Sequence, residues 1–381
     1  MRRAIFFIVC AGLLAAPLPA QIGKQVMVRA GTPEDRALTA IYNATEPAQK
    51  LALIEKFIHD FGNDDSILLG LDLMMTYHME AKAYDKVFEV GAQALERDAM
   101  NFTAAYRMFT AAQAKGDVAK LTEYAEKVAA IVKEFNQLPP PAGTDANSWT
   151  ERKAGALTDV ETSISYVEYA MFTIAYQISD GVAKGELLER FVAAFPESQY
   201  NANAEHMAAT AYLSVKAYDK MIAFAEKVLA RKPDHVQMLL ILADYWSESG
   251  EHLDKAEEFG KRGLALLETA AKPENVDEAQ WAQVKALQSG LLQSALGQVL
   301  IHRNLNAEAV EAFRAAGPLV RADNTAYARN QYRLGYTLAK MNRMTDARAA
   351  LLEAVALETP YKQLAQQTLR QIGPARPRKR Q

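Results

Sequence analysis

Residues 82–86 read Lys-Ala-Tyr-Asp-Lys, and the same five residues recur at 216–220. The offset of 134 residues between the copies extends on both sides of this pentapeptide. It pairs Glu55 with Glu189, Phe57 with Phe191, Phe61 with Phe195, Thr76 with Thr210 and Arg97 with Arg231. The chain therefore contains an internal duplication, and both copies are expected to fold in the same way.

A shorter period lies inside each copy. Apolar positions suited to a helix recur at spacings of 34 or 35 residues, at Leu53, Val87 and Leu121 and again at Leu187, Met221 and Ala256. Equivalent positions near the C-terminus are Ala309 and Ala347. A period of this size is typical of helix-pair repeats, and no stretch shows the sustained alternation of a half-buried strand. The sequence predicts an all-α solenoid of about eight helix pairs.

The last repeat is the easiest to interpret. Its pattern runs through Leu334, Gly335 and Leu338, a turn at residues 341–343, and then Ala347, Leu351, Ala354 and Pro360. Small residues let two helices approach closely, large ones fill the space between them, and the proline stops the second helix. This pattern resembles a tetratricopeptide repeat. Residues 195–200, Phe-Pro-Glu-Ser-Gln-Tyr, are similar to a turn in the repeats of bacterial envelope-assembly proteins.

Two insertions interrupt the period, and both contain proline followed by tryptophan. They hold Pro139 to Pro141 with Trp149, and Pro273 with Trp281. Each is expected to end one helix and start a long one, over roughly residues 148–179 and 276–303. The predicted segments are a signal peptide (1–20), a first lobe (32–137), an insertion with a long helix (138–179), a second lobe (180–271), a long helix with C-terminal pairs (272–372) and a disordered basic tail (373–381).

The N-terminus has the features of a secretory signal. Arg2 and Arg3 precede an apolar run over residues 4–16, and small Ala20 marks the expected cleavage position. No later stretch is long enough to predict a membrane span. We therefore expect an exported protein, periplasmic or secreted. Its only cysteine, Cys10, lies inside the signal, so no disulfide is predicted.

The charge balance and the missing motifs limit the function. A formal net charge of −3 disfavours nucleic acid as a partner. The basic residues of the tail could touch an anionic surface weakly, although a plain solvated tail explains them better. No catalytic, phosphate-binding or metal-binding motif is present, so no cofactor is expected and the chain is predicted not to be an enzyme. The alternative is a cell-wall hydrolase whose acid pair is Asp244 and Glu248, four residues apart on one helix face.

The tetratricopeptide resemblance implies a concave groove lined by the first helix of each pair. A protein or peptide partner in that groove would meet Tyr106, His206, Asp244, Gln298, Arg329, Tyr332, Tyr336 and Lys340. The lysine and asparagine of the carboxylate-clamp subtype are missing from these positions, which argues against chaperone tails as partners. The prediction is a non-catalytic scaffold of the cell envelope or periplasm. A solvated groove without a ligand, and a self-assembling structural solenoid, remain as alternatives.

Overall fold

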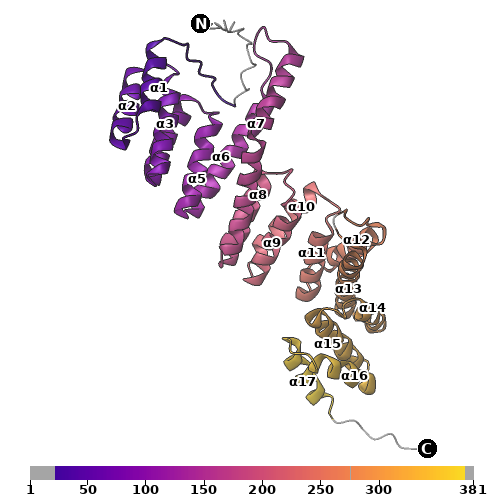
Figure 1. The fold of residues 1–381 in the computed structure, drawn as a ribbon. Coiled ribbons are helices and arrows are strands. Elements are labelled where there is room, and N and C mark those ends of the chain that lie inside the picture. The colour runs from indigo at the N-terminus through magenta and orange to yellow at the C-terminus, as the bar shows by residue number, and fades with distance from the viewer. Residues whose placement is uncertain (1–21, 275, 374–381) are drawn as a thin grey trace, which may run out of the picture. The chain divides into compact units, whose positions relative to one another are not determined.

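A computed structural model describes residues 22–274 and 276–373 of the chain (Figure 1). Within these ranges it contains 17 α-helices, one short 3-10 helix and no strand. The predicted signal peptide and all of the predicted tail after Gly373 lie outside the described residues. The chain divides into two compact units, of which the first ends at Ala204 and the second begins at Glu205.

The helices follow one another with short connections. The first unit contains α1 (Pro33–Asn43), α2 (Pro47–Asp60), α3 (Ile67–Glu80), α4 (Tyr84–Arg97), α5 (Phe102–Lys115), α6 (Val118–Gln137), α7 (Ala146–Ile174), η1 (Ala175–Gln177) and α8 (Gly181–Ala194). Helix α9 (Asn201–Ser214) starts there and continues into the second unit. The second unit contains α10 (Tyr218–Arg231), α11 (Val236–Ser249), α12 (Leu253–Thr269), α13 (Glu278–His302), α14 (Asn306–Leu319), α15 (Asn324–Lys340), α16 (Met344–Val355) and α17 (Tyr361–Gln371).

The helices are arranged as pairs. Each of the helices α3, α5, α11, α13 and α15 packs against the helix that follows it. All eight predicted anchor positions fall in the second helix of a pair, from α2 to α16. Seven of them are buried, and only Leu53 is half-exposed. The prediction of an all-α solenoid of about eight helix pairs is therefore confirmed, and α17 follows the last pair.

The duplicated pentapeptide forms the tight turn between the two helices of a pair. Lys82 and Lys216 have left-handed backbones, with φ of 56° and 60°. The next residue in each copy donates its N–H to a carbonyl five residues earlier, Ala83 to His78 at 2.8 Å and Ala217 to Tyr212 at 2.9 Å. This is the hydrogen bond of a Schellman motif, which satisfies a carbonyl at the helix end. Asn304 and Asn342 hold the same position in later pairs, with φ of 59° and 64°.

The two long helices also form, as α7 and α13. Aspartates cap both, since Asp145 accepts from the Ser148 N–H at 2.9 Å and Asp277 from the Gln280 N–H at 2.8 Å. Helix α7 ends at Ile174, before the predicted end at residue 179, because Ile178 has extended backbone and Asp180 already caps α8. Trp149 packs edge-on against Phe135 at a centroid distance of 6.1 Å, and its indole N–H donates to the Leu138 carbonyl at 3.1 Å.

Small residues set the distance between paired helices. A Cβ added to Gly335 in α15 would lie 2.6 Å from Cγ of Leu351 in α16. A Cβ on Gly297 in α13 would lie 2.6 Å from the ring of Phe313 in α14. The backbone of the first helix therefore touches a large apolar side chain of the second, and only glycine leaves room for this contact.

Candidate functional site

A pocket of about 330 Å³ lies in the second unit, and its walls come from alternate helices. Helices α11, α13 and α15 are the first helices of three consecutive pairs, and α17 closes the series. The lining residues are Glu248, Gln298, Ile301, Arg329, Tyr332, Arg333, Tyr336, Tyr361 and Leu364. We call this the α15 pocket. Four of the predicted partner-binding residues therefore meet here, namely Gln298, Arg329, Tyr332 and Tyr336.

Two arginines of α15 face two acids of α11 beneath the pocket. Arg329 donates to Asp244 at 2.8 Å, and only 15% of its side chain is exposed. Arg333 is more deeply buried, at 4% exposure, and donates both to Glu248 and to the Ser294 hydroxyl at 2.9 Å. Asp244 also lies 3.8 Å from Arg333. Two acids spaced four residues apart on α11 thus pair with two arginines spaced four residues apart on α15, and these ion pairs connect the two helices.

Arg333 was not among the predicted partner-binding residues, although the sequence contains a signal for it. Asp244 and Glu248 are four residues apart, and so are Arg329 and Arg333. Matching spacings place each pair on one helix face, so the two faces can meet. The sequence did not show that these faces were opposite each other.

This network favours the ionised form of Asp244. Burial alone would raise the pKa of Asp244, but the charges of Arg329 and Arg333 outweigh it and hold the pKa below its usual value. Burial also opposes the charge of Arg329, yet Asp244 keeps the pKa of that guanidinium raised. An ionised carboxylate held by guanidinium groups is a poor general acid. The arrangement thus favours a structural role for Asp244 and Glu248 over an acid pair.

Tyrosines form the open wall of the pocket. The ring of Tyr332 lies 6.3 Å from that of Tyr336 and 6.2 Å from that of Tyr361, between centroids. Tyr336 is 41% exposed, and the ammonium of Lys340 lies 6.0 Å from its ring centre. Tyrosine combines a large apolar surface with a hydroxyl group that can form hydrogen bonds. The exposed wall therefore suits contact with another molecule better than the paired arginines do.

Two of the predicted residues lie elsewhere. Tyr106 is on α5 in the first unit, where its ring stacks on Phe102 and Phe109 at 6.1 and 6.4 Å. His206 is on α9, with its side chain at the surface, and does not line the α15 pocket. Both residues lie on the first helix of a pair, as predicted, but the α15 pocket is lined only by α11, α13, α15 and α17.

Beside His206, Glu205 is the centre of a buried ionic cluster. Its carboxylate is fully buried and accepts from Lys232 at 3.0 Å and from Nε2 of His235 at 3.1 Å. Nδ1 of His235 caps α11 by accepting from the Met238 N–H at 3.4 Å, which leaves the ring proton on Nε2. Burial raises the pKa of Glu205, but these hydrogen bonds lower it more. The cluster joins α9 to the start of α11 and favours the ionised form of Glu205.

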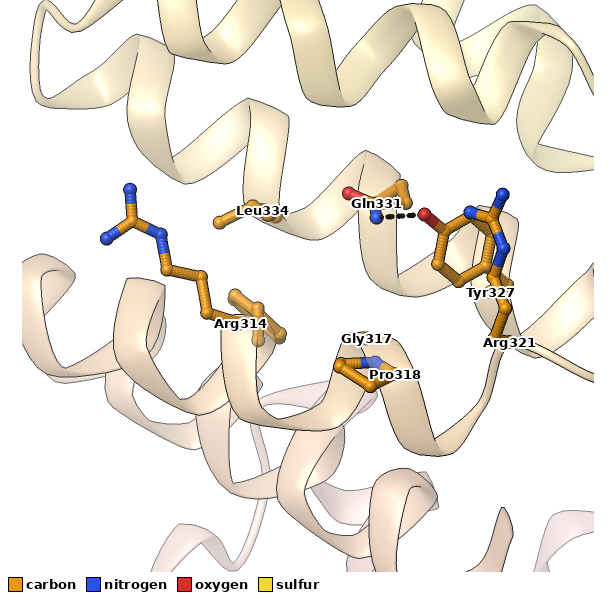
Figure 2. A pocket seen from close by; sticks show the side chains of 8 residues that line it. Arg314, Gly317, Pro318, Arg321, Tyr327, Gln331 and Leu334 are labelled. Carbon is orange, nitrogen blue, oxygen red and sulfur yellow. Dashed lines mark hydrogen bonds between the residues drawn. The ribbon is translucent and has the colours of Figure 1, made fainter. Parts of the chain in front are cut away.

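A second pocket, of about 350 Å³, opens between α14 and α15 (Figure 2). Figure 2 shows Arg314 and Tyr327 on opposite sides of it, with Gly317 and Pro318 between them. Its polar groups already have partners. Gln331 donates to the Tyr327 hydroxyl at 2.7 Å, and the Arg321 guanidinium lies 4.2 Å above the Tyr327 ring. We therefore regard the α15 pocket as the better candidate site.

Searches of the described residues for two other kinds of site find neither. Over residues 22–274 and 276–373, no three or more histidine, cysteine or acidic side chains are grouped so that they could hold a metal ion. Among the same residues, no helix is long and apolar enough to cross a bilayer.

Comparison with known proteins identifies one repeat directly. Residues 328–359, which cover most of α15 and all of α16, match the family model described as "Tetratricopeptide repeat". The matched segment contains Gly335, Leu338, Ala347 and Leu351, the residues that carried the resemblance in the sequence. A search of curated proteins finds no match.

Comparison with solved structures gives matches of low identity. A thermophilic TPR protein of Thermus thermophilus, TTC0263, is 15% identical with a TM-score of 0.36, and the match covers 54% of this chain and 98% of that one. Yeast Tom70 is 12% identical with a TM-score of 0.37, covering 92% of this chain and 66% of Tom70. The P58(IPK) TPR domain is 9% identical with a TM-score of 0.30, and the match covers 90% of this chain and 100% of that domain.

The geometry of the matched repeat recurs elsewhere in the chain. The matched pair α15 and α16 has the tight turn and close glycine contact that recur in the pair α13 and α14. The internal duplication extends the same turn to Lys82 and Lys216. Taken together, these features show that residues 328–359 form a tetratricopeptide repeat, within an α-solenoid whose other helix pairs share its tight turn and close helix contact.

Proposed function

We propose that the chain is a non-catalytic scaffold that binds a segment of another protein in the α15 pocket. One observation carries this proposal. Three consecutive first helices and α17 converge on one pocket, whose arginines are fixed by internal acids while its tyrosines stay partly exposed. A pocket of this size holds a few side chains of a partner, and tyrosines are frequent anchors at protein interfaces.

Different residues of the pocket would have different roles. Tyr332 and Tyr336 would supply contact area and hydrogen bonds, with the Gln298 amide beside them. Arg329, which the sequence suggested as an anchor, would instead hold the wall in place through Asp244. Preorganised walls lower the entropic cost of binding, so fixed arginines would favour affinity without touching the partner.

The place of action is also a proposal. We propose that the protein is exported and acts in the cell envelope or periplasm, on the basis of Arg2 and Arg3, the apolar run over residues 4–16 and small Ala20. Detection of the processed chain in an osmotic-shock fraction, with a new N-terminus near Gln21, would support export. Retention of an unprocessed chain in the cytoplasm would contradict it.

A crosslinking experiment tests the binding proposal. A photoreactive phenylalanine derivative at position 336 is expected to capture a defined partner in intact cells, and Tyr332→Ala should reduce that product at least fivefold. The matched control carries the same group at Leu352, which is 52% exposed on the second helix of the same pair. Equal capture from positions 336 and 352, or capture that ignores Tyr332→Ala, would count against the pocket.

A further inference from the structure

The segment that precedes α1 lies along the first unit, and its side chains alternate between exposed and half-buried from Gln25 to Val28. This segment, residues 22–28, is the N-terminal strap, drawn as the indigo coil before α1 in Figure 1. Ile22 is 1% exposed and Val26 and Val28 are half-buried, whereas Lys24, Gln25 and Met27 are exposed. Alternation of this kind is what an extended segment shows when one side rests on a surface.

The surface beneath the strap has specific hydrogen-bond acceptors. Asp98, 8% exposed, accepts the Lys24 backbone N–H with one carboxylate oxygen at 2.7 Å and the Met100 N–H with the other at 3.1 Å. The Lys24 ammonium pairs with Asp65 at 2.8 Å. These acids lie in the connections that lead into α5 and α3, so the strap crosses the starts of two first helices.

Glycine is required at one position of the strap. Gly23 has φ of +100°, in the region that favours glycine, and a Cβ there would lie 2.5 Å from Oδ2 of Asp98 and 2.9 Å from the Met100 carbonyl. The surface therefore selects a large aliphatic residue, then glycine, then a basic residue that offers its backbone N–H. The requirements for an aliphatic residue, a glycine and a basic residue in that order are those of a sequence-selective binding site.

The strap does not fill its site. A cavity of about 110 Å³ remains beside Val26, lined also by Leu68, Asp72 and Thr103 of the helix starts. A larger apolar side chain at the Val26 position would occupy that space and gain contacts that valine leaves unmade. A segment from another protein could therefore fit better than the chain's own strap.

We infer that the first unit carries a binding site for an extended segment with the pattern large aliphatic, glycine, basic, and that the strap fills this site in cis. Being covalently attached, the strap acts at an effective concentration in the millimolar range and excludes outside segments of similar affinity. The strap is an autoinhibitory ligand. A partner with a larger apolar residue two positions after the basic one would displace it and open the starts of α3 and α5.

A peptide added in trans tests this inference. The probe is a fluorescent peptide with the sequence of residues 22–29, Ile-Gly-Lys-Gln-Val-Met-Val-Arg, and its anisotropy is measured with the full chain. Gly23→Ala should release the strap, so the probe is expected to bind this variant at least tenfold more tightly than the wild type. Gly31→Ala is the matched control, because Gly31 also has a positive φ, +81°, but no atom lies within 4 Å of a Cβ there.

Changes in the peptide test the chemistry of the site. Alanine in place of its isoleucine should weaken binding to the Gly23→Ala chain at least tenfold, and leucine at the Val26 position should strengthen it about fourfold, the effect of one buried methylene. Ile22→Ala in the chain is a second way to release the strap and should give the same result. Equal binding to wild type and both released variants, or binding to none of them while their circular dichroism stays native, would overturn the inference.

Discussion

Replacement of Asp244 by asparagine should destabilise the second unit strongly. Asparagine keeps the shape of the side chain but removes the charge that faces Arg329 at 2.8 Å and Arg333 at 3.8 Å. Both guanidinium groups then remain in the interior, with side chains only 15% and 4% exposed. Removal of one member of a buried ion pair costs about 3–5 kcal/mol. We expect about 3 kcal/mol for Asp244→Asn, because Glu248 still compensates Arg333.

Glu248→Gln provides the matched control on the same helix. Glu248 also pairs with Arg333, but its own side chain is 45% exposed. Exposed ion pairs contribute about 0–1 kcal/mol, and Arg333 would keep its bonds to Ser294. We expect a loss of about 1 kcal/mol, so the two variants should differ by about 2 kcal/mol although both neutralise one acid of α11.

Urea unfolding followed by tryptophan fluorescence measures this difference. Trp246 lies on α11 with 1% exposure, and Trp149→Phe removes the tryptophan of the first unit. A probe confined to the second unit is needed because two units need not unfold together. Equal shifts of the urea midpoint for Asp244→Asn and Glu248→Gln, at unchanged slope, would refute the claim that burial decides the strength of this network.

Two further predictions concern pH and packing. The pKa values of Asp244 and Glu205 lie below their ordinary values of 3.8 and 4.5, so their stabilisation is complete above those values and is lost as the pH falls through and below them. Glu205→Gln should therefore lower the urea midpoint of unfolding at pH 7. Between pH 7 and pH 3 the midpoint of this variant should fall less than that of the wild type, and an equal fall in both would contradict the prediction. Gly335→Ala should lower the free energy of unfolding by about 1–3 kcal/mol, because the new Cβ would lie 2.6 Å from Leu351. Gly155→Ala in α7 should raise it by about 0.5–1 kcal/mol, because no atom lies within 4 Å of a Cβ there and alanine favours the helix. Thermal unfolding of the two variants measures this difference. A similar loss of stability in both would show that the close contact between helices does not cause the effect of Gly335→Ala.

The repeat pattern predicted the fold because it is a local property. Each pair buries its apolar face on its neighbours, so a helix position such as Val87 or Ala347 must be buried wherever the pair lies in the stack. The left-handed turn at Lys82 and Lys216 is equally local, since a Schellman motif involves six consecutive residues. The end of α7 was predicted less well, because the cap at Asp180 competes with helix continuation.

The candidate site was predicted in part. The tetratricopeptide resemblance implied that Gln298, Arg329, Tyr332 and Tyr336 lie on first helices and face a groove, and the structure places those four around one pocket. Tyr361 was missed because α17 follows the last pair and lies outside the repeat pattern. The strap was also missed, because Ile22 lies close to the expected cleavage position and belongs to no helix period.

The sequence by itself determined which residues form helices, how the helices pair, and which side of each helix is apolar. Those properties depend on spacings of three to five residues and on a period of 34, all of which are visible along the chain. Only the tertiary structure decided that Arg329 and Arg333 face Asp244 and Glu248, and that Asp98 receives the backbone of Lys24. Such partners are tens of residues apart, and the angle at which successive helices pack, which no local pattern encodes, determines whether they meet.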